Sequence, residues 1–219
     1  ENISFAAHPL INYIVDDSLW NNLNSDYAVD QFRSTTPLEN ALNIYWAPSL
    51  LNGSLCGISA FSFMSIDSIA MQPQCVGRPD VRGVFAHEVG HWFDLFHTFE
   101  TYDGTECVSG SNCATAGDLV CDTPASFGLE FDVCVNAANC ELTCTNVAGP
   151  CPGDPVYDPS TVNFMSYSTP NCLTEFTPGQ YSRLRTTAVN FRVDYLDTYL
   201  HDPCPADFDG NSVVDVDDL

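Results

Sequence analysis

The order of apolar and polar positions predicts a mixed α/β unit over residues 1–80. Two short apolar runs, residues 13–15 and 41–46, have the composition of strands, and residues 18–33 between them fit a helix. Alternation over residues 56–64 predicts another strand, with residues 68–76 as its neighbour. We therefore expect a small twisted sheet in this part of the chain.

The pattern changes to a helical period after Pro79, with Asp80 as the expected N-cap. A second helical pattern covers residues 177–200 and has Thr177 as its expected cap. The segment between them, residues 98–162, is rich in Gly, Pro, Asp and Asn and holds seven cysteines. A stretch of that length inside a compact domain needs disulfides or calcium to order it.

Residues 87–97 read HEVGHWFDLFH. His87 and His91 are four apart, so on a helix they project from one face and can reach a single zinc ion. Glu88 follows the first of them, where its carboxylate can take a proton from an activated water. His97 can join the same ion if the helix ends soon after His91 and the chain turns back. Three neutral imidazoles leave one position open, which is the catalytic arrangement of zinc.

A lone His-Glu-x-x-His can also occur by chance on a solvated helix. Against that alternative, the chain has only five histidines, and three of them fall within these eleven residues. The other two, His8 and His201, have no such neighbours, and we expect them to be ordinary surface residues.

The charge balance excludes some partners. The chain has 29 acidic and six basic residues and a net charge of −23, which repels nucleic acid phosphates and anionic membranes. The acidic excess fits a solvated surface, calcium binding, or both. No apolar run is long enough to cross a bilayer, so we expect no membrane span. Eleven cysteines without paired Cys-x2-Cys knuckles indicate disulfides and hence export, with one cysteine left over.

The motif at residues 87–97 resembles the longer metzincin form His-Glu-x-x-His-x-x-Gly-x-x-His, and NFMSY at residues 163–167 looks like the methionine turn of that family. GDLVCDTP at residues 117–124 and FTPGQYSRLR at residues 176–185 are similar to the pappalysin branch. One position departs from the pattern, because Asp94 stands where the family has glycine. Asp tolerates a left-handed backbone better than most residues, so we expect the turn to survive.

The resemblance implies an α+β fold: a metzincin-type zincin with a mixed twisted sheet, an active-site helix, a Cys-rich irregular C-terminal subdomain and a C-terminal helix. The catalytic domain is expected at residues 1–202, divided near residue 92 into subdomains 1–92 and 93–202, and a truncated dockerin-like calcium-binding segment at residues 203–219.

The resemblance also implies roles for individual residues. Glu88 is the general base, Tyr167 stabilises the oxyanion, and Met165 forms a hydrophobic floor below the imidazoles. Residues 57–63 are expected to form the edge strand that binds substrate as an added strand. The stretch after the methionine turn, residues 168–171, lacks the carboxylate with which some relatives select basic side chains.

Pairings of the cysteines come partly from the resemblance, which implies Cys121 with Cys151 and Cys144 with Cys172. Short separations suggest Cys107 with Cys113 and Cys134 with Cys140, and the two adjacent strands suggest Cys56 with Cys75. Cys204 is left over.

The C-terminal tail places oxygen side chains at calcium-loop spacing. Its expected ligands are Asp207, Asp209, Asn211, Asp215 and Asp218. The glycine falls at loop position 4 and the last ligand is Asp, so the loop is no standard EF-hand and looks like half of a dockerin repeat. The alternative is a disordered acidic tail. A bound Ca²⁺ would be structural and would attach the protein to a cell-surface or scaffold partner.

Together these features predict a secreted zinc-dependent endopeptidase that carries one catalytic zinc ion and hydrolyses extracellular proteins. One alternative is a catalytically silent binding module on the same scaffold, tethered through the calcium loop. Another is a zinc hydrolase of small molecules. The intact Glu88 argues against the first alternative, and the edge strand argues against the second.

Overall fold

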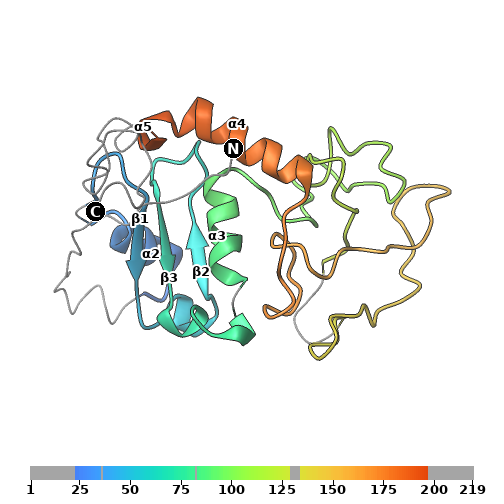
Figure 1. Cartoon of the computed structure of the whole chain (residues 1–219), viewed down its shortest axis with the longest axis horizontal. Coiled ribbons are helices and arrows are strands. Elements are labelled where there is room, and N and C mark those ends of the chain that lie inside the picture. The colour runs from blue at the N-terminus through green and yellow to red at the C-terminus, as the bar shows by residue number, and fades with distance from the viewer. Residues whose placement is uncertain (1–22, 36, 82, 129–133, 197–219) are drawn as a thin grey trace, which may run out of the picture.

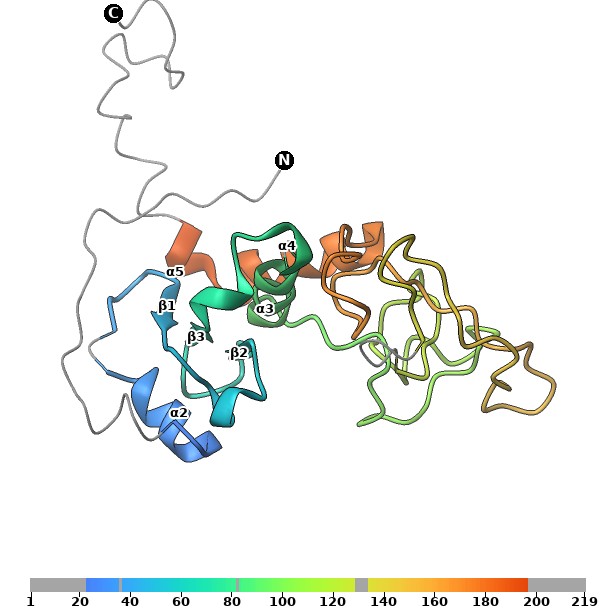
Figure 2. The same ribbon diagram turned by 90° about the horizontal axis from the view of Figure 1, so that it is seen from below.

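The computed structural model describes residues 23–35, 37–81, 83–128 and 134–196 (Figures 1 and 2). Its helices and strands are, in chain order, α2 (Asp26–Phe32), β1 (Asn43–Trp46), β2 (Gly57–Ser59), β3 (Ser68–Met71), α3 (Val84–Trp92), α4 (Pro178–Phe191) and α5 (Val193–Leu196). Short 3-10 turns occur at Leu51–Gly53, Pro73–Cys75 and Pro79–Val81. The strand expected at residues 13–15 and the expected calcium ligands of the tail lie outside the described residues. Within the described part, no helix combines the length and the apolar character that a bilayer span requires.

Three strands form a mixed sheet in the order β1-β3-β2. β3 is central and buried along its whole length; it pairs in parallel with β1 and antiparallel with β2, with Gly57 opposite Met71. Its alternate side chains enter different clusters, because Ile69 and Met71 pack with α3 whereas Ala70 packs with α2. The two helices therefore cover opposite faces of the sheet (Figure 2), and β1 and β2 form the two edges of the described sheet.

Helix α3 starts later than the sequence suggested. Asp80 lies in a preceding 3-10 turn, where it forms an exposed ion pair with Arg78, and the N-cap residue of α3 is Gly83. The prediction of Asp80 as N-cap was therefore wrong, because Asp80 belongs to a separate 3-10 turn that ends before α3 begins.

The long helix α4 lies across the end of the sheet and reaches over to the irregular half of the molecule (Figure 1). Thr177 caps it as predicted, in a capping box with Gln180. On its inner face, Leu184 and Ala188 join the core cluster that contains Trp92 of α3. This helix thus holds the two halves of the chain against each other.

Between α3 and α4 the described chain forms only isolated β-bridges, which fits the irregular Cys-rich subdomain expected there. The mixed sheet, the helix that carries the histidines and the C-terminal helix agree with the expected fold class. The division into domains stays a prediction, although α3 ends at Trp92, the expected subdomain boundary.

All ten cysteines assigned to disulfides are bonded, but only one predicted pair, Cys56–Cys75, is present. The other bridges are Cys107–Cys151, Cys113–Cys121, Cys134–Cys144 and Cys140–Cys172. The predictions Cys121–Cys151, Cys144–Cys172, Cys107–Cys113 and Cys134–Cys140 were therefore wrong.

Local hydrogen bonds explain two of these differences. The Asp154 carboxylate accepts the backbone N–H groups of Val108, Ser109 and Cys151, which brings Cys107 beside Cys151. The carbonyl of Cys134 accepts a hydrogen bond from the N–H of Thr143. This bond places Cys134 beside Cys144, the residue after Thr143, and the two cysteines form a disulfide. Hydrogen bonds of this kind cannot be predicted from the spacing of the cysteines.

Candidate metal centre and cleft

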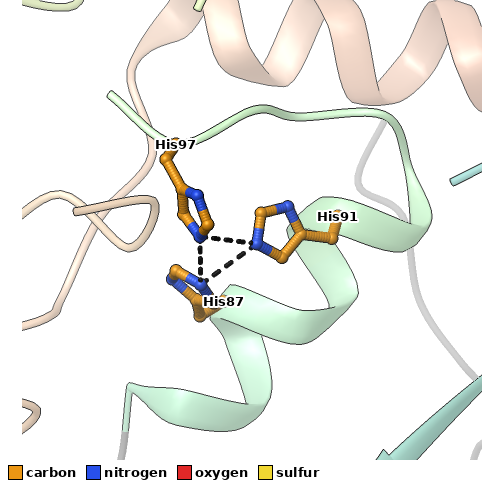
Figure 3. Close-up of side chains that lie close together, drawn as sticks. All are labelled: His87, His91 and His97. Atoms are coloured by element: carbon orange, nitrogen blue, oxygen red, sulfur yellow. Dashed lines mark hydrogen bonds between the residues drawn. The ribbon is translucent and has the colours of Figure 1, made fainter. Parts of the chain in front are cut away.

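Helix α3 presents His87 and His91 from one face, and the chain returns so that His97 completes a triangle (Figure 3). The Nε2 atoms are 3.1 Å apart between His87 and His91, 3.0 Å between His91 and His97, and 3.2 Å between His97 and His87. The sequence prediction that these three side chains meet is confirmed by this geometry.

Backbone carbonyls fix the orientation of two of the rings. His87 Nδ1 lies 2.6 Å from the carbonyl oxygen of Phe164, and His91 Nδ1 lies 2.8 Å from that of Leu95. A carbonyl can only accept, so each Nδ1 carries the proton and each Nε2 presents a lone pair to the centre of the triangle. The ring of His97 stacks on Phe99, with centroids 4.8 Å apart and an interplanar angle of 6°.

The turn after α3 makes the return of His97 geometrically feasible. Asp94 has φ of 65° and follows the C-cap residue Phe93. The N–H of Leu95 donates to the Gly90 carbonyl, and the N–H of Asp94 donates to the His91 carbonyl, which together form a Schellman motif. The aspartate therefore adopts the left-handed conformation for which the family pattern uses glycine.

The methionine turn supports the histidines from below. Met165 is fully buried in the core cluster that includes Trp92, and its carbonyl accepts the N–H of Thr98, the residue after His97. A Cβ on Gly90 would lie 2.4 Å from the Met165 sulfur, so glycine lets the turn approach α3 closely. These contacts place Met165 against α3 beside Gly90, and its expected role as a hydrophobic floor below the imidazoles stays a prediction.

Asn163 locks the same turn to α4. It exchanges two hydrogen bonds with the Gln180 side chain, at 2.7 Å and 3.1 Å, and its Oδ1 also accepts the N–H of Met165. This amide pair was not predicted from the sequence. Both residues lie in the stretches that carry the family resemblance, which was the available signal.

Burial keeps the three imidazoles neutral. It lowers the pKa of His87 to about 4, that of His97 to about 3, and that of His91 well below the usual value. The three Nε2 atoms lie 3.0–3.2 Å apart, and none of them carries a proton, so each can offer its lone pair to a metal ion.

This donor set fits a zinc ion. Ligands at tetrahedral angles with bonds of about 2.0–2.1 Å stand roughly 3.3 Å apart, close to the spacing observed here. The described residues thus include a three-histidine site suited to a single metal ion.

Beside the histidines runs a cleft of about 240 Å³. Its lining consists of Leu55, Gly57, Ile58, Ser59, Phe61, His87, Glu88, His91, His97, Glu100 and Tyr167. The edge strand β2 supplies Gly57, Ile58 and Ser59 to this lining. Tyr167 also lines the cleft, and its ring centroid lies 4.6 Å from that of His97.

Glu88 points into this cleft from the turn of α3 that faces β2. Burial raises the pKa of its carboxyl group to about 8, and the positive charge of Arg33 partly offsets this effect. A Cβ on Gly57 would lie 2.7 Å from Cγ and 2.8 Å from Cδ of Glu88. The absence of a side chain at Gly57 therefore leaves the space that the Glu88 side chain occupies. This need for glycine at position 57 was not predicted from the sequence.

Two further residues line the cleft. Phe61 lies within residues 57–63, the expected substrate strand, and packs against the His91 ring with centroids 5.4 Å apart. Glu100 was missed; its Oε1 accepts the N–H groups of Thr101 and Tyr102. It belongs to no recognisable motif, and only its nearness in sequence to His97 could have pointed to it.

Comparison with known proteins adds independent information. A family model described as Peptidase M43, pregnancy-associated plasma protein-A, matches residues 75–189. An extracellular metalloprotease of Colletotrichum graminicola is 39% identical over 215 residues, covering 89% of this chain and 67% of that protein. An extracellular metalloprotease of Pyricularia oryzae is 32% identical over 162 residues, covering 69% of this chain and 49% of that protein.

A structural comparison finds mature mirolysin of Tannerella forsythia in complex with a cleaved peptide. It has a TM-score of 0.49 and 21% sequence identity, and the match covers 80% of this chain and 58% of the mirolysin chain. Several curated relatives are much longer than the matched region, since the chain spans 30%, 49% and 29% of three of them.

The site and the family match agree on the class, which is that of the metalloproteases. Within this class, the chain belongs to the Peptidase M43 family of pregnancy-associated plasma protein-A, the pappalysins.

Proposed function

We propose that this chain is the catalytic part of a secreted zinc endopeptidase that cleaves exposed segments of extracellular proteins. The observation that carries the proposal is the convergence of three neutral Nε2 atoms within 3.0–3.2 Å beside Glu88, at a cleft bordered by an edge strand. His87, His91 and His97 would hold the zinc ion. When bound, zinc lowers the pKa of a coordinated water and polarises the scissile carbonyl.

Each of the chain's own groups then has a defined task. Backbone groups of β2 pair with an extended peptide and align it along the cleft. Glu88, which lines the cleft next to His87, accepts a proton from the attacking water and gives it to the leaving nitrogen. The Tyr167 hydroxyl donates a hydrogen bond to the oxyanion as negative charge develops there. Met165 and the carbonyl of Phe164 keep the ligand rings in place.

Secretion is supported by the extracellular relatives and by the five disulfides of the described residues, which form and persist in oxidising compartments. Calcium binding by the tail and its attachment to a scaffold partner form a separate prediction, because residues 203–219 lie outside the described part.

The test is a mixed peptide library cut by the wild type and by Glu88→Gln, with products mapped by mass spectrometry. Each protein is first shown to be folded and to contain one equivalent of zinc. Chelator-sensitive cuts made by the wild type and reduced at least about 1,000-fold in the variant are expected. A folded, zinc-loaded wild type that cuts no peptide would refute the proposal and favour a binding module. Cleavage of small esters but not of peptides would favour a different zinc hydrolase.

A further inference from the structure

Asp94 differs from the family pattern in more than its backbone. Its carboxylate is buried, and it links two segments that are distant in sequence. Oδ1 accepts the N–H of Ser62 at 2.7 Å, and Oδ2 accepts the Ser62 hydroxyl at 2.6 Å and the Thr187 hydroxyl at 3.2 Å. A glycine at this position would form the turn but none of these three bonds.

Ser62 connects the carboxylate to the cleft. It follows the edge strand β2 and is adjacent to Phe61, whose ring lines the cleft. The Phe61 ring also contacts Phe96, with centroids 5.3 Å apart, and the His91 ring. The segment Phe61–Ser62 is therefore attached in two ways to the chain between His91 and His97. Phe61 packs on the rings of His91 and Phe96, and Ser62 donates two hydrogen bonds to Asp94.

Thr187 connects the same carboxylate to α4. It is buried on that helix one turn after Arg183, whose guanidinium lies 4.7 Å from the centre of the Phe96 ring. The arginine also donates to the Asp118 carbonyl at 2.9 Å. Phe96 is thus held between the cleft-lining Phe61 and a cation on α4. The turn, the end of the edge strand and α4 meet at the Asp94 carboxylate.

A β-carbon makes the left-handed backbone less favourable than it is for glycine. The side chain at this position must therefore add contacts that offset this cost, and all three of its hydrogen bonds go to other segments. Two of the three go to the residue that follows Phe61.

We propose that Asp94 is a positioning residue: it holds the segment at Phe61 and Ser62, and with it the substrate strand, at a fixed place relative to the metal-binding histidines. The inference rests on the proposed peptidase function and adds a determinant that the glycine of the family pattern cannot supply. The Asp94 carboxylate acts on substrate placement and leaves the metal site intact, because its bonds go to Ser62 and Thr187, and a glycine variant keeps both the turn and the carbonyls of Phe164 and Leu95 that accept from His87 and His91.

The test compares Asp94→Gly, which installs the family residue, with Asp94→Asn, which keeps an acceptor for the Ser62 N–H. For Asp94→Gly we expect a KM about tenfold higher, in line with the sensitivity of catalysis to small misplacements. Its kcat per zinc-loaded molecule should stay within about threefold, and its zinc dissociation constant within about threefold, measured by chelator competition. Asp94→Asn should keep KM within about threefold of the wild type.

Two measurements test the link between Asp94 and Ser62, and the effect on KM separates positioning from a merely structural role. Amide exchange at Ser62, followed by NMR, should accelerate at least about tenfold in Asp94→Gly and little in Asp94→Asn. Ser62→Ala should raise KM in the wild-type background but have no further effect in Asp94→Gly, as expected of a coupled pair. If Asp94→Gly folds poorly, Ser62→Ala alone keeps the proposal testable, because it leaves Asp94 and the turn unchanged, removes one bond to the carboxylate and should still raise KM.

Three results would overturn the inference. An Asp94→Gly enzyme that loses only thermal stability would make the carboxylate purely structural. Loss of zinc in that variant would place its role at the metal, and independent effects of Ser62→Ala and Asp94→Gly would break the proposed link. A wild type that cleaves no peptide contradicts the proposed function instead, and the exchange rate of the Ser62 amide still reports whether the link exists.

Discussion

Replacing Gly57 with alanine is expected to disable the general base while leaving the metal site intact. Gly57 is the first residue of β2 and faces Glu88 across the narrow contact between the edge strand and α3. An added Cβ would lie 2.6 Å from the Met71 sulfur and 2.7 Å and 2.8 Å from Cγ and Cδ of Glu88. Met71 is fully buried on the central strand, so we expect the glutamate to move.

The size of the effect follows from these contacts. Nonbonded carbon atoms prefer separations of about 3.5–4.0 Å, so the Glu88 side chain has to shift by about 1 Å. A displacement of about 1 Å in a catalytic group can cost on the order of 100-fold in rate. Overpacking of this kind also lowers the free energy of unfolding by about 1–3 kcal/mol. The three atoms nearest to the added methyl group belong to Met71 and Glu88 and not to a histidine, so zinc binding should persist.

The assay measures kcat and KM on a fluorogenic peptide, zinc content and the unfolding midpoint. A matched control is Gly149→Ala, whose Cβ would meet Asp154 Cβ at 2.5 Å and the Pro155 carbonyl at 2.7 Å in the Cys-rich half. The control should lose stability and keep its kcat, whereas Gly57→Ala should lose about 100-fold in kcat. If Gly57→Ala keeps kcat within about threefold of the wild type, the reasoning that ties Glu88 to this glycine is wrong.

Three further predictions address other residues. Tyr167→Phe should lower kcat about 100-fold without loss of zinc; an unchanged kcat would remove the tyrosine from the mechanism. Thr177→Ala should lower the free energy of unfolding by about 1 kcal/mol in chemical denaturation, because it breaks the capping box with Gln180; an unchanged unfolding midpoint would contradict this. Burial and the nearby Asp118 raise the pKa of Glu106 to about 7 from 4.5. The folded state then holds this proton more tightly than the unfolded state, so the stabilisation is present below about pH 4.5 and is lost as the pH rises through 7. With chelator present, the free energy of unfolding of the wild type should therefore fall more between pH 5 and 8 than that of Glu106→Gln. If the two proteins show the same dependence of this free energy on pH, the prediction for Glu106 is wrong.

The metal site was predictable because it is local in sequence. Three histidines within eleven residues need only a helix and one turn, and helical spacing supplies the first pair. Whether His97 could return depended on the backbone at Asp94, and general conformational preferences of Asp were enough to expect the left-handed φ that the structure has. The pairing of β2 with β3 followed in the same way from alternation in neighbouring segments.

Several of the features that were missed join distant parts of the chain. The space left by Gly57 for Glu88 depends on how closely β2 approaches α3, and the Asn163–Gln180 pair depends on where α4 docks. The predicted partner of Cys107 was wrong for the same reason, since the Asp154 carboxylate holds Val108 and Ser109 close to Cys151. Spacing along the sequence carries no information about such contacts.

The interleaved disulfides keep the chain in one piece after a proteolytic cut in its irregular half. Cys107–Cys151 and Cys140–Cys172 overlap, so together they enclose every peptide bond from Cys107 to Cys172. One cut anywhere in this irregular stretch, whether by a neighbouring enzyme or by another copy of this chain, leaves the two fragments covalently joined. The nicked molecule keeps its mass on a non-reducing gel, and the segment that carries the methionine turn stays tethered to the helix that carries His87.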